Sequence, residues 1–141
     1  MKVLAVDYGE RRVGLAVSDP TGTLARPLPA LVRRRGRRPP VQRIAELARA
    51  EGVSEIVVGW PLDLEGEEGP RAREVRAFAE ALAQRTGLPV RLWDERLTTV
   101  RAQRTLRESG ARASERRRKS RADEIAACWI LQAYLDACRA P

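Results

Sequence analysis

Short apolar runs alternate along this chain with segments whose apolar residues recur at helical spacing. The runs near residues 3–7 and 53–59 are apolar on both faces, as is typical of central strands. A run of small apolar residues at 13–18 predicts a strand that another element approaches closely. We expect five strands, at Val3–Asp7, Val13–Ser18, Thr23–Arg26, Val53–Gly59 and Leu88–Trp93, with Pro27 and Pro29 ending the third.

Helical periodicity fills the spaces between the later strands. One helix is predicted from Val41, with Gly52 as its stop, and another opens at Pro70 and ends before Gly87. We also expect a short helix at about 98–109 and a last helix from Ser120 to about Cys138. The last helix is apolar nearly all round, which predicts that it is buried.

This order of elements predicts an α/β fold with a mixed sheet. The first three strands should form an antiparallel meander, and the two later strands should arrive by helical crossovers, parallel to the first. We therefore expect a five-stranded sheet flanked by helices. At 141 residues the chain is expected to be a single domain, 1–141.

The charge balance favours a polyanionic partner. The chain has 27 Lys and Arg against 19 Asp and Glu, a net charge of +8, and much of the excess lies in two clusters at 33–38 and 112–121. Such a surface suits nucleic acid first and an anionic membrane second. No apolar run reaches transmembrane length and no signal peptide is visible, so we expect no membrane association and a cytoplasmic location.

Histidine is absent from the sequence. Its absence excludes catalytic triads that use an imidazole base, His-based nucleases and most zinc sites. If the protein is a hydrolase, carboxylates and a hard divalent metal must carry the reaction.

Asp7, Glu95 and Asp123 are the carboxylates that the topology brings to one place. Asp7 and Glu95 follow strands whose carboxyl ends share an edge of the sheet, where ligands bind in such folds, and the last helix can carry Asp123 there. Each also has a structural interpretation: a turn for Asp7, an exposed loop for Glu95, and for Asp123 a capping box that begins at Ser120. Together, three acids would favour Mg²⁺ or Mn²⁺, because converging carboxylates repel without a cation.

Four segments, in order, resemble the RuvX/YqgF family of RNase H-like proteins. They are Asp7-Tyr8-Gly9-Glu10-Arg11-Arg12-Val13-Gly14-Leu15-Ala16-Val17-Ser18-Asp19, Gly59-Trp60-Pro61-Leu62, Asp94-Glu95-Arg96-Leu97-Thr98-Thr99, and Lys119-Ser120-Arg121-Ala122-Asp123 followed by Ala126-Ala127. The resemblance implies an RNase H-like fold with Asp7, Glu95 and Asp123 as its catalytic, metal-binding triad. It also implies two activities, processing the 5′ end of precursor 16S rRNA and resolving Holliday junctions. The sequence does not identify a fourth metal-binding carboxylate, for which Asp19, Asp94 and Glu124 are candidates.

The leading hypothesis is thus a metal-dependent endonuclease that acts on precursor 16S rRNA. Branched DNA as substrate, and a nucleic-acid-binding assembly factor without catalysis, stay as alternatives, and we expect a monomer or weak homodimer. A phosphate-binding protein of the actin and sugar-kinase type is disfavoured, because the chain is too short for a second large domain. The side chains expected to hold nucleic acid are basic: Arg11, Arg12, Arg33, Arg34, Arg35, Arg37, Arg38, Arg96, Arg116, Arg117, Arg118 and Lys119.

Overall fold

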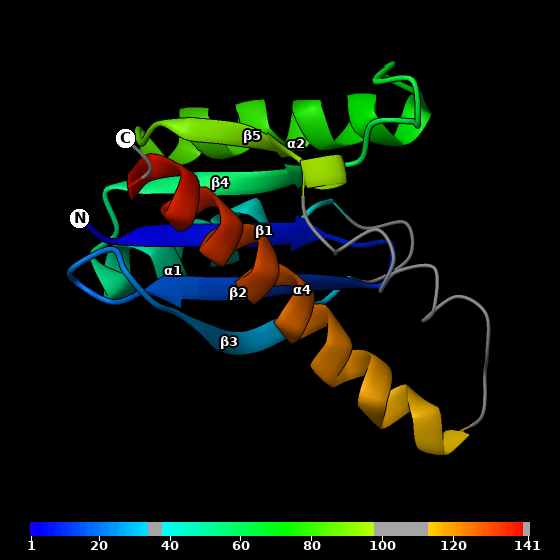
Figure 1. Cartoon of the computed structure of the whole chain (residues 1–141), viewed down its shortest axis with the longest axis horizontal. Coiled ribbons are helices and arrows are strands. Elements are labelled where there is room, and N and C mark those ends of the chain that lie inside the picture. Colours follow the sequence, from blue (N-terminus) through cyan, green and yellow to red (C-terminus); the bar gives the residue numbers. More distant parts are fainter. Residues whose placement is uncertain (34–37, 98–112, 140–141) are drawn as a thin grey trace.

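The computed structural model places five strands in one mixed sheet (Figure 1). It describes residues 1–33, 38–97 and 113–139, and for 113–124 it describes the backbone alone. The strands are β1 (Val3–Tyr8), β2 (Arg12–Ser18), β3 (Ala25–Val32), β4 (Glu55–Trp60) and β5 (Val90–Asp94). The helices are α1 (Val41–Glu51), α2 (Pro70–Thr86), the 3₁₀ helix η1 (Glu95–Leu97) and α4 (Ala113–Arg139).

The sheet has the topology that the sequence predicts. Its strand order is β3-β2-β1-β4-β5. The meander pairs are antiparallel, whereas β4 pairs parallel to β1 and β5 pairs parallel to β4. The carboxyl ends of β1, β4 and β5 therefore meet at one edge, which is the edge expected to hold the site.

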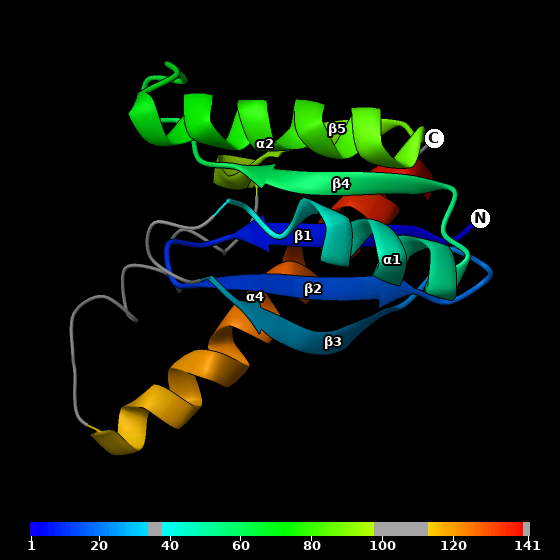
Figure 2. The same cartoon turned by 180° about the vertical axis from the view of Figure 1, so that it is seen from behind.

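Helices cover both faces of the sheet. Helix α4 crosses one face, and α1 and α2 lie on the other, as the two opposite views show (Figures 1 and 2). Because successive side chains of β1 point to opposite faces of the sheet, they contribute to two core clusters, one on each face. Leu4, Val6 and Tyr8 belong to the cluster with α1 and α2, whereas Val3 and Ala5 pack with α4.

The two helices between the strands end as predicted. Gly52 follows α1 with φ 66° and Gly87 follows α2 with φ 72°, both in the left-handed region that glycine adopts without steric cost. Pro70 opens α2. The short helix expected at about 98–109 lies outside the described residues.

The third strand is longer than predicted. It was expected to stop at Arg26, but β3 runs from Ala25 to Val32 and includes Pro27 and Pro29. A proline cannot donate to a sheet ladder, but an edge strand needs hydrogen bonds on one side only. Since β3 pairs only with β2, and its register shifts between Val13 and Leu15, both prolines are tolerated.

The last helix begins earlier than predicted. It starts at Ala113 rather than Ser120, so residues 113–119 of the basic cluster are helical. The capping-box interpretation of Ser120 to Asp123 is therefore wrong, because Asp123 lies well inside the helix. Charge density misled the prediction, since Arg, Lys and Glu are good helix formers. Within the described part of the chain, no helix combines the length and apolarity needed to cross a membrane.

Candidate active site

Asp7 lies near the end of β1 and is almost fully buried. Its exposed fraction is 3%, and the alternation along β1 places it on the face that α4 covers. The backbone turns sharply after it, and the Gly9 N–H is 3.0 Å from both Asp7 O and Arg12 O. A Cβ atom on Gly9 would lie 2.5 Å from Arg12 O, so this turn requires glycine.

Glu95 is the first residue of η1, directly after β5, and its exposed fraction is also 3%. Its side chain lies against Gly59 of β4. A Cβ atom on Gly59 would be 2.7 Å from Glu95 Oε1 and 2.6 Å from Ile130 Cδ1 of α4. The missing side chain of Gly59 thus makes room for the Glu95 carboxylate beneath the helix.

The register of the sheet places Asp7 next to this carboxylate. Val6 of β1 pairs with Val58 of β4, so the next residues, Asp7 and Gly59, are neighbours on adjacent strands, about 4.8 Å apart. Both lie on the face covered by α4, since Ala5 and Val57 one pair earlier pack with that helix. The structure therefore brings Asp7 and Glu95 together at the predicted edge.

Asp123 lies on the helix that covers them. Its backbone is seven residues before Ile130, which is about 10.5 Å, or two turns, along α4. The opposite end of α4 is fixed by the hydroxyl of Tyr134, which donates to Glu55 Oε1 (3.0 Å) at the beginning of β4. The N-terminal half of α4 consequently extends toward the edge where β1 and β4 end (Figure 1).

The acids at this edge have the donor type that a hard divalent ion prefers. Among the described side chains, no group of three His, Cys, Asp or Glu residues is close enough to hold a metal. The side chain of Asp123, the third expected ligand, is not among them. Two buried carboxylates at the ends of β1 and β5, on either side of Gly59 of β4, nevertheless fit Mg²⁺ or Mn²⁺, which take oxygen ligands and complete their shells with water and phosphate.

Two arginines support the backbone just after Asp7. Arg71 of α2 donates to Tyr8 O, and Arg33 donates to Gly9 O at 2.8 Å. Both guanidinium groups lie over the Tyr8 ring, with Arg33 4.1 Å from its centroid. Of these residues, the sequence indicated Arg33 as a nucleic-acid contact, whereas its bond to Gly9 O gives it a structural role as well.

Arg96 also makes contacts within the protein. Its guanidinium donates to Asp94 (2.7 Å), which raises the pKa of Arg96. It lies against Gly66, whose φ of 82° requires glycine at the turn of the 63–69 loop. Arg96 therefore orders the loop beside Glu95, and Asp94, one candidate for a fourth carboxylate, is engaged with this arginine.

The other predicted basic residues fall into three groups. Arg11 lies in the turn between β1 and β2, Arg12 is the first residue of β2, and Arg38 is exposed next to α1. Arg34, Arg35 and Arg37 lie outside the described residues. Arg116, Arg117, Arg118 and Lys119 lie on the N-terminal half of α4, where only the backbone is described.

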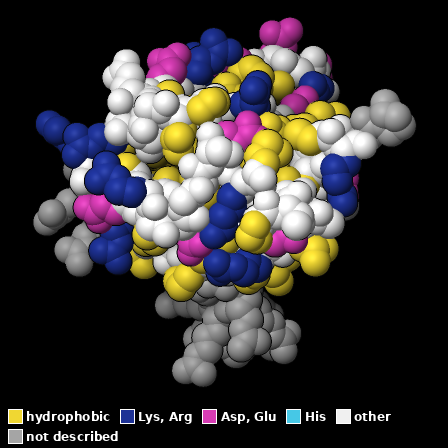
Figure 3. Space-filling view, turned by 90° about the vertical axis from the view of Figure 1, so that its left-hand side faces the viewer, with side chains coloured by type: hydrophobic (Ala, Val, Ile, Leu, Met, Phe, Trp, Pro, Cys, Tyr) yellow, Lys and Arg dark blue, Asp and Glu magenta, His cyan; other side chains and the backbone are white. Residues whose placement is uncertain are grey.

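The opposite edge of the sheet carries mixed charge. Basic and acidic side chains are interspersed there (Figure 3), and Lys2 forms an ion pair with Glu51 at 3.0 Å. Asp19 lies at this edge because it follows β2, which runs antiparallel to β1. Hydrogen bonds from the Thr23 N–H and the Thr21 hydroxyl lower the pKa of Asp19. Asp19 is therefore a turn-forming residue, far from the position of a fourth ligand.

Sequence reasoning missed the role of Gly59. Gly59 entered the sequence analysis only as part of a motif that resembles the family, but the structure shows that its bare Cα accommodates Glu95 and Ile130. A glycine inside an otherwise β-branched, buried strand is the signal that could have indicated a close approach. Arg71 was also missed, because no local pattern in the first turn of α2 predicts a bond to a backbone carbonyl of β1.

This strand order, with buried acids where the parallel strands end and a helix across them, defines an RNase H-like fold. Two solved structures of Thermus thermophilus RuvC share it, one of them in complex with a Holliday junction substrate. That complex superposes with a TM-score of 0.56 at 17% identity, covering 99% of this chain and 97% of that chain. The second has a TM-score of 0.55 at 17% identity, covering 98% and 97%. At such identity the likeness concerns the fold.

The chain belongs to the RuvX family, described as Holliday junction resolvase, whose profile matches residues 1–137. Curated relatives span nearly all of it. A protein of Pelotomaculum thermopropionicum is 44% identical over 136 residues, covering 96% of this chain and 87% of its own. One of Myxococcus xanthus is 44% identical over 141 residues, covering 100% and 91%. Both carry the name "Putative pre-16S rRNA nuclease".

Proposed function

We propose that this protein is a cytoplasmic, divalent-metal-dependent endonuclease that cleaves the 5′ region of precursor 16S rRNA, with Asp7, Glu95 and Asp123 as its metal ligands. The observation that carries the proposal is the burial of Asp7 and Glu95 at the carboxyl edge of the parallel strands, where Asp7 ends β1 and Glu95 follows β5 with β4 between them. An ionised carboxylate is costly to bury unless positive charge compensates it. A bound cation would supply the positive charge that compensates the two buried carboxylates.

The chain's own residues supply positioning and charge for the reaction. Gly9 and Gly59 allow the backbone and the Glu95 side chain to approach closely, and Arg33 and Arg71 hold the turn that follows Asp7. A bound Mg²⁺ or Mn²⁺ pair would lower the pKa of a water and stabilise charge on the scissile phosphate. Arg11, in the turn after β1, and Arg12, at the start of β2, would hold the phosphates of the strand.

Precursor 16S rRNA is the substrate that the names of the relatives support. Relatives 44% identical over nearly the full chain carry that name, and a net charge of +8 suits a long polyanion. The basic residues predicted on the N-terminal half of α4 would continue the contact with RNA away from the acids. Salt should weaken binding steeply, since phosphate contacts release counterions.

The test is cleavage of a precursor 16S rRNA fragment by pure protein. We expect Asp7→Asn and Glu95→Gln to lose at least about a hundredfold in rate, because a lost ligand removes several kcal/mol of transition-state stabilisation. EDTA should abolish cleavage and Mn²⁺ should restore it. Asp19→Asn is the matched control, since it removes an acid at the opposite edge and should keep full activity. Cleavage by Asp7→Asn at the wild-type rate would refute the site.

Resolution of branched DNA is the second candidate, favoured by the description of the family as Holliday junction resolvase. Symmetric cutting of two strands requires two copies of the site, so a resolvase should act as a dimer. A four-way junction should be tested beside the RNA, with sedimentation to measure the oligomeric state. Paired symmetric nicks by a dimer would favour the resolvase. Binding of either substrate without any metal-dependent cleavage would favour a non-catalytic assembly factor.

A further inference from the structure

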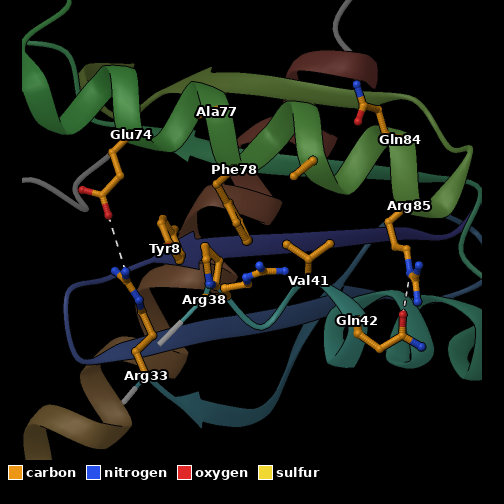
Figure 4. Close-up of a pocket in the computed structure, with 12 residues that line it drawn as sticks. Tyr8, Arg33, Arg38, Val41, Gln42, Glu74, Ala77, Phe78, Gln84 and Arg85 are labelled. Atoms are coloured by element: carbon orange, nitrogen blue, oxygen red, sulfur yellow. Dashed lines mark hydrogen bonds and ion pairs between the residues drawn. The ribbon is translucent and has the colours of Figure 1, made fainter. Parts of the chain in front are cut away.

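A cavity lies on the face of the sheet opposite α4 and the two acids. It measures about 920 Å³ and opens between α1, α2 and residues 38–40. Figure 4 shows Val41, Ala77 and Phe78 around it, with Gln84 and Arg85 toward one end. This volume is that of a pocket for a small organic ligand, and its wall is mostly apolar.

Tyr8 lines this cavity and carries a buried hydroxyl that has no hydrogen-bond partner among the residues that the structure describes. The residue is 2% exposed, and its ring stacks on Phe78 with 4.0 Å between the centroids and 5° between the planes. Buried hydroxyl groups normally have a hydrogen-bond partner, so the Tyr8 hydroxyl can form a hydrogen bond with a bound ligand.

The charges around the cavity are mainly positive. Arg33 is engaged by Glu74 at 3.4 Å and lies over the Tyr8 ring, and Arg85 donates to Gln42. Arg38 is exposed, and no described residue forms an ion pair with it. The cavity thus combines an apolar wall, glutamine amides and an available guanidinium, which together match a planar base joined to an anionic phosphate.

We propose that this cavity binds a nucleotide, with the base against Val41 and Ala77, and the phosphate on Arg38. The amide of Gln84 can bond the polar edge of a base, and the outer face of the Arg33 guanidinium offers a stacking surface. The Gln42 amide marks one end of the cavity and is already engaged, since its Oε1 accepts from Arg85 and its Nε2 donates to Glu46. The nucleotide is either an unpaired unit of a nucleic-acid strand or a free mononucleotide. The cavity is distinct from the metal-binding edge and is not assigned by the family resemblance.

The cavity is linked to the acidic site through the end of β1. Tyr8 directly follows Asp7 and points to the opposite face of the sheet. Arg33, which lines the cavity, donates to Gly9 O in the turn after Asp7. A strand lying at the acids can therefore pass over this turn and place a nucleotide beyond the cleavage point in the cavity. This strand form of the inference rests on the proposed function, whereas binding of a mononucleotide does not.

The side-chain amides give a direct readout of binding. The chain has no asparagine and only four glutamines: Gln42, Gln84, Gln103 and Gln132. Two of the four line the cavity, so a ¹⁵N-correlation spectrum of the full-length protein has few amide pairs to assign, using Gln42→Glu and Gln84→Glu. The protein should carry Asp7→Asn, which prevents cleavage of added RNA. We expect AMP, or a penta-adenylate RNA, to shift the signals of Gln42 and Gln84 and leave that of Gln132, on α4, in place.

Matched variants test the location and the chemistry. Arg38→Ala should weaken nucleotide binding about tenfold, since it removes a charged hydrogen bond to the phosphate. Arg43→Ala removes the same charge from an exposed position on α1 outside the cavity and should have no such effect. Ala77→Phe should fill the cavity and abolish binding, whereas Ala50→Phe, exposed on α1, should not.

The outcomes separate the two sources and the two proposals. Shifts with penta-adenylate but not with AMP assign the cavity to a substrate strand, and shifts with AMP alone assign it to a free nucleotide. Shifts with AMP stand even if the protein shows no nuclease activity, so failure of the proposed function is recognised separately. Unshifted Gln42 and Gln84 signals with both probes, or equal affinities for Arg38→Ala and Arg43→Ala, would overturn the inference.

Discussion

The carboxylate of Glu95 lies against Gly59, and its Oε1 is 2.7 Å from the place that a Cβ atom on Gly59 would occupy. Gly59 in turn neighbours Asp7 across the β1–β4 ladder. The position of one buried acid relative to the other thus depends on a residue that has no side chain. Ile130 of α4 closes the same space from above, at 2.6 Å from that Cβ position.

Gly59→Ala should therefore inactivate the protein without unfolding it. The added methyl group must displace the Glu95 carboxylate and the Ile130 side chain, and overpacking of this kind costs about 1–3 kcal/mol of unfolding free energy. We expect the cleavage rate to fall by at least about tenfold, since a displacement near 1 Å in an active site has large effects. Single-turnover cleavage and thermal unfolding measure the two effects.

Gly69→Ala is the control for this change. No atom lies within 4 Å of the Cβ position on Gly69, and its φ of −83° suits any residue. It should keep the wild-type rate. If Gly59→Ala kept that rate as well, Glu95 would not need its observed position.

Tyr134→Phe should loosen the helix that carries Asp123. The Tyr134 hydroxyl donates to Glu55 Oε1 at 3.0 Å, and Arg91 holds Glu55 Oε2 at 3.2 Å. Removing the hydroxyl leaves a largely buried acceptor with one partner fewer, so we expect a loss of about 1–2 kcal/mol in the free energy of unfolding. Urea unfolding at neutral pH measures this, and an unchanged midpoint would show that α4 is held by apolar packing alone.

The same hydroxyl should make stability depend on alkaline pH. Burial and the hydrogen bond to Glu55 raise the pKa of Tyr134 above its ordinary value of 10.0. A group whose pKa is higher in the folded state stabilises the protein fully below the unfolded value and loses this contribution as pH rises. Stability should thus fall above pH 10 more steeply in the wild type than in Tyr134→Phe, as measured by urea unfolding at several pH values. Parallel curves would contradict this assignment.

Asp19 should make stability depend on acidic pH, with the opposite sign to Tyr134. Hydrogen bonds from the Thr23 N–H, the Thr21 hydroxyl and the Leu24 N–H lower the pKa of Asp19 from 3.8. Its stabilising contribution is therefore present above that value and is lost as pH falls through the lowered pKa. Asp19→Asn should melt below the wild type at pH 6, and the two melting temperatures should converge toward pH 2.

Glu80→Gln provides the comparison for Asp19. Glu80 is exposed on α2, and no hydrogen bond or ion pair reaches it among the described residues. We expect its melting temperature to differ from the wild type by the same small amount at both pH values. A gap between Asp19→Asn and wild type that stayed constant from pH 6 to pH 2 would contradict the role given to the Asp19 carboxylate.

The sheet could be predicted because its signals are local. Buried strands such as Val3–Tyr8 show as continuous apolar runs, and Gly52 and Gly87 mark helix ends through a backbone conformation that other residues avoid. The strand order followed from connection lengths and crossover rules. The end of the third strand was predicted wrongly because Pro27 is compatible with a strand only at the edge of a sheet. Which strand lies at the edge depends on the complete sheet.

The candidate site could be predicted in part for a similar reason. Asp7 and Glu95 were predictable because each ends a recognisable strand, and parallel strands share an edge. The space above Gly59 and the bond from Arg71 to Tyr8 O depend on residues far apart in sequence, which no local pattern encodes. The cavity beside Tyr8 is of the same kind, since its lining comes from four separate segments.

Binding of Mn²⁺ tests the central claim most directly, namely that Asp7, Glu95 and Asp123 hold one metal centre. The electron paramagnetic resonance signal of free Mn²⁺ should be followed during titration of wild type, Asp7→Asn, Glu95→Gln and Asp123→Asn, with Asp136→Asn as an exposed control on α4. We predict at least about a tenfold loss of affinity in each of the three variants, as for removal of a metal ligand, and none in Asp136→Asn. Wild-type affinity in Asp123→Asn would contradict the account.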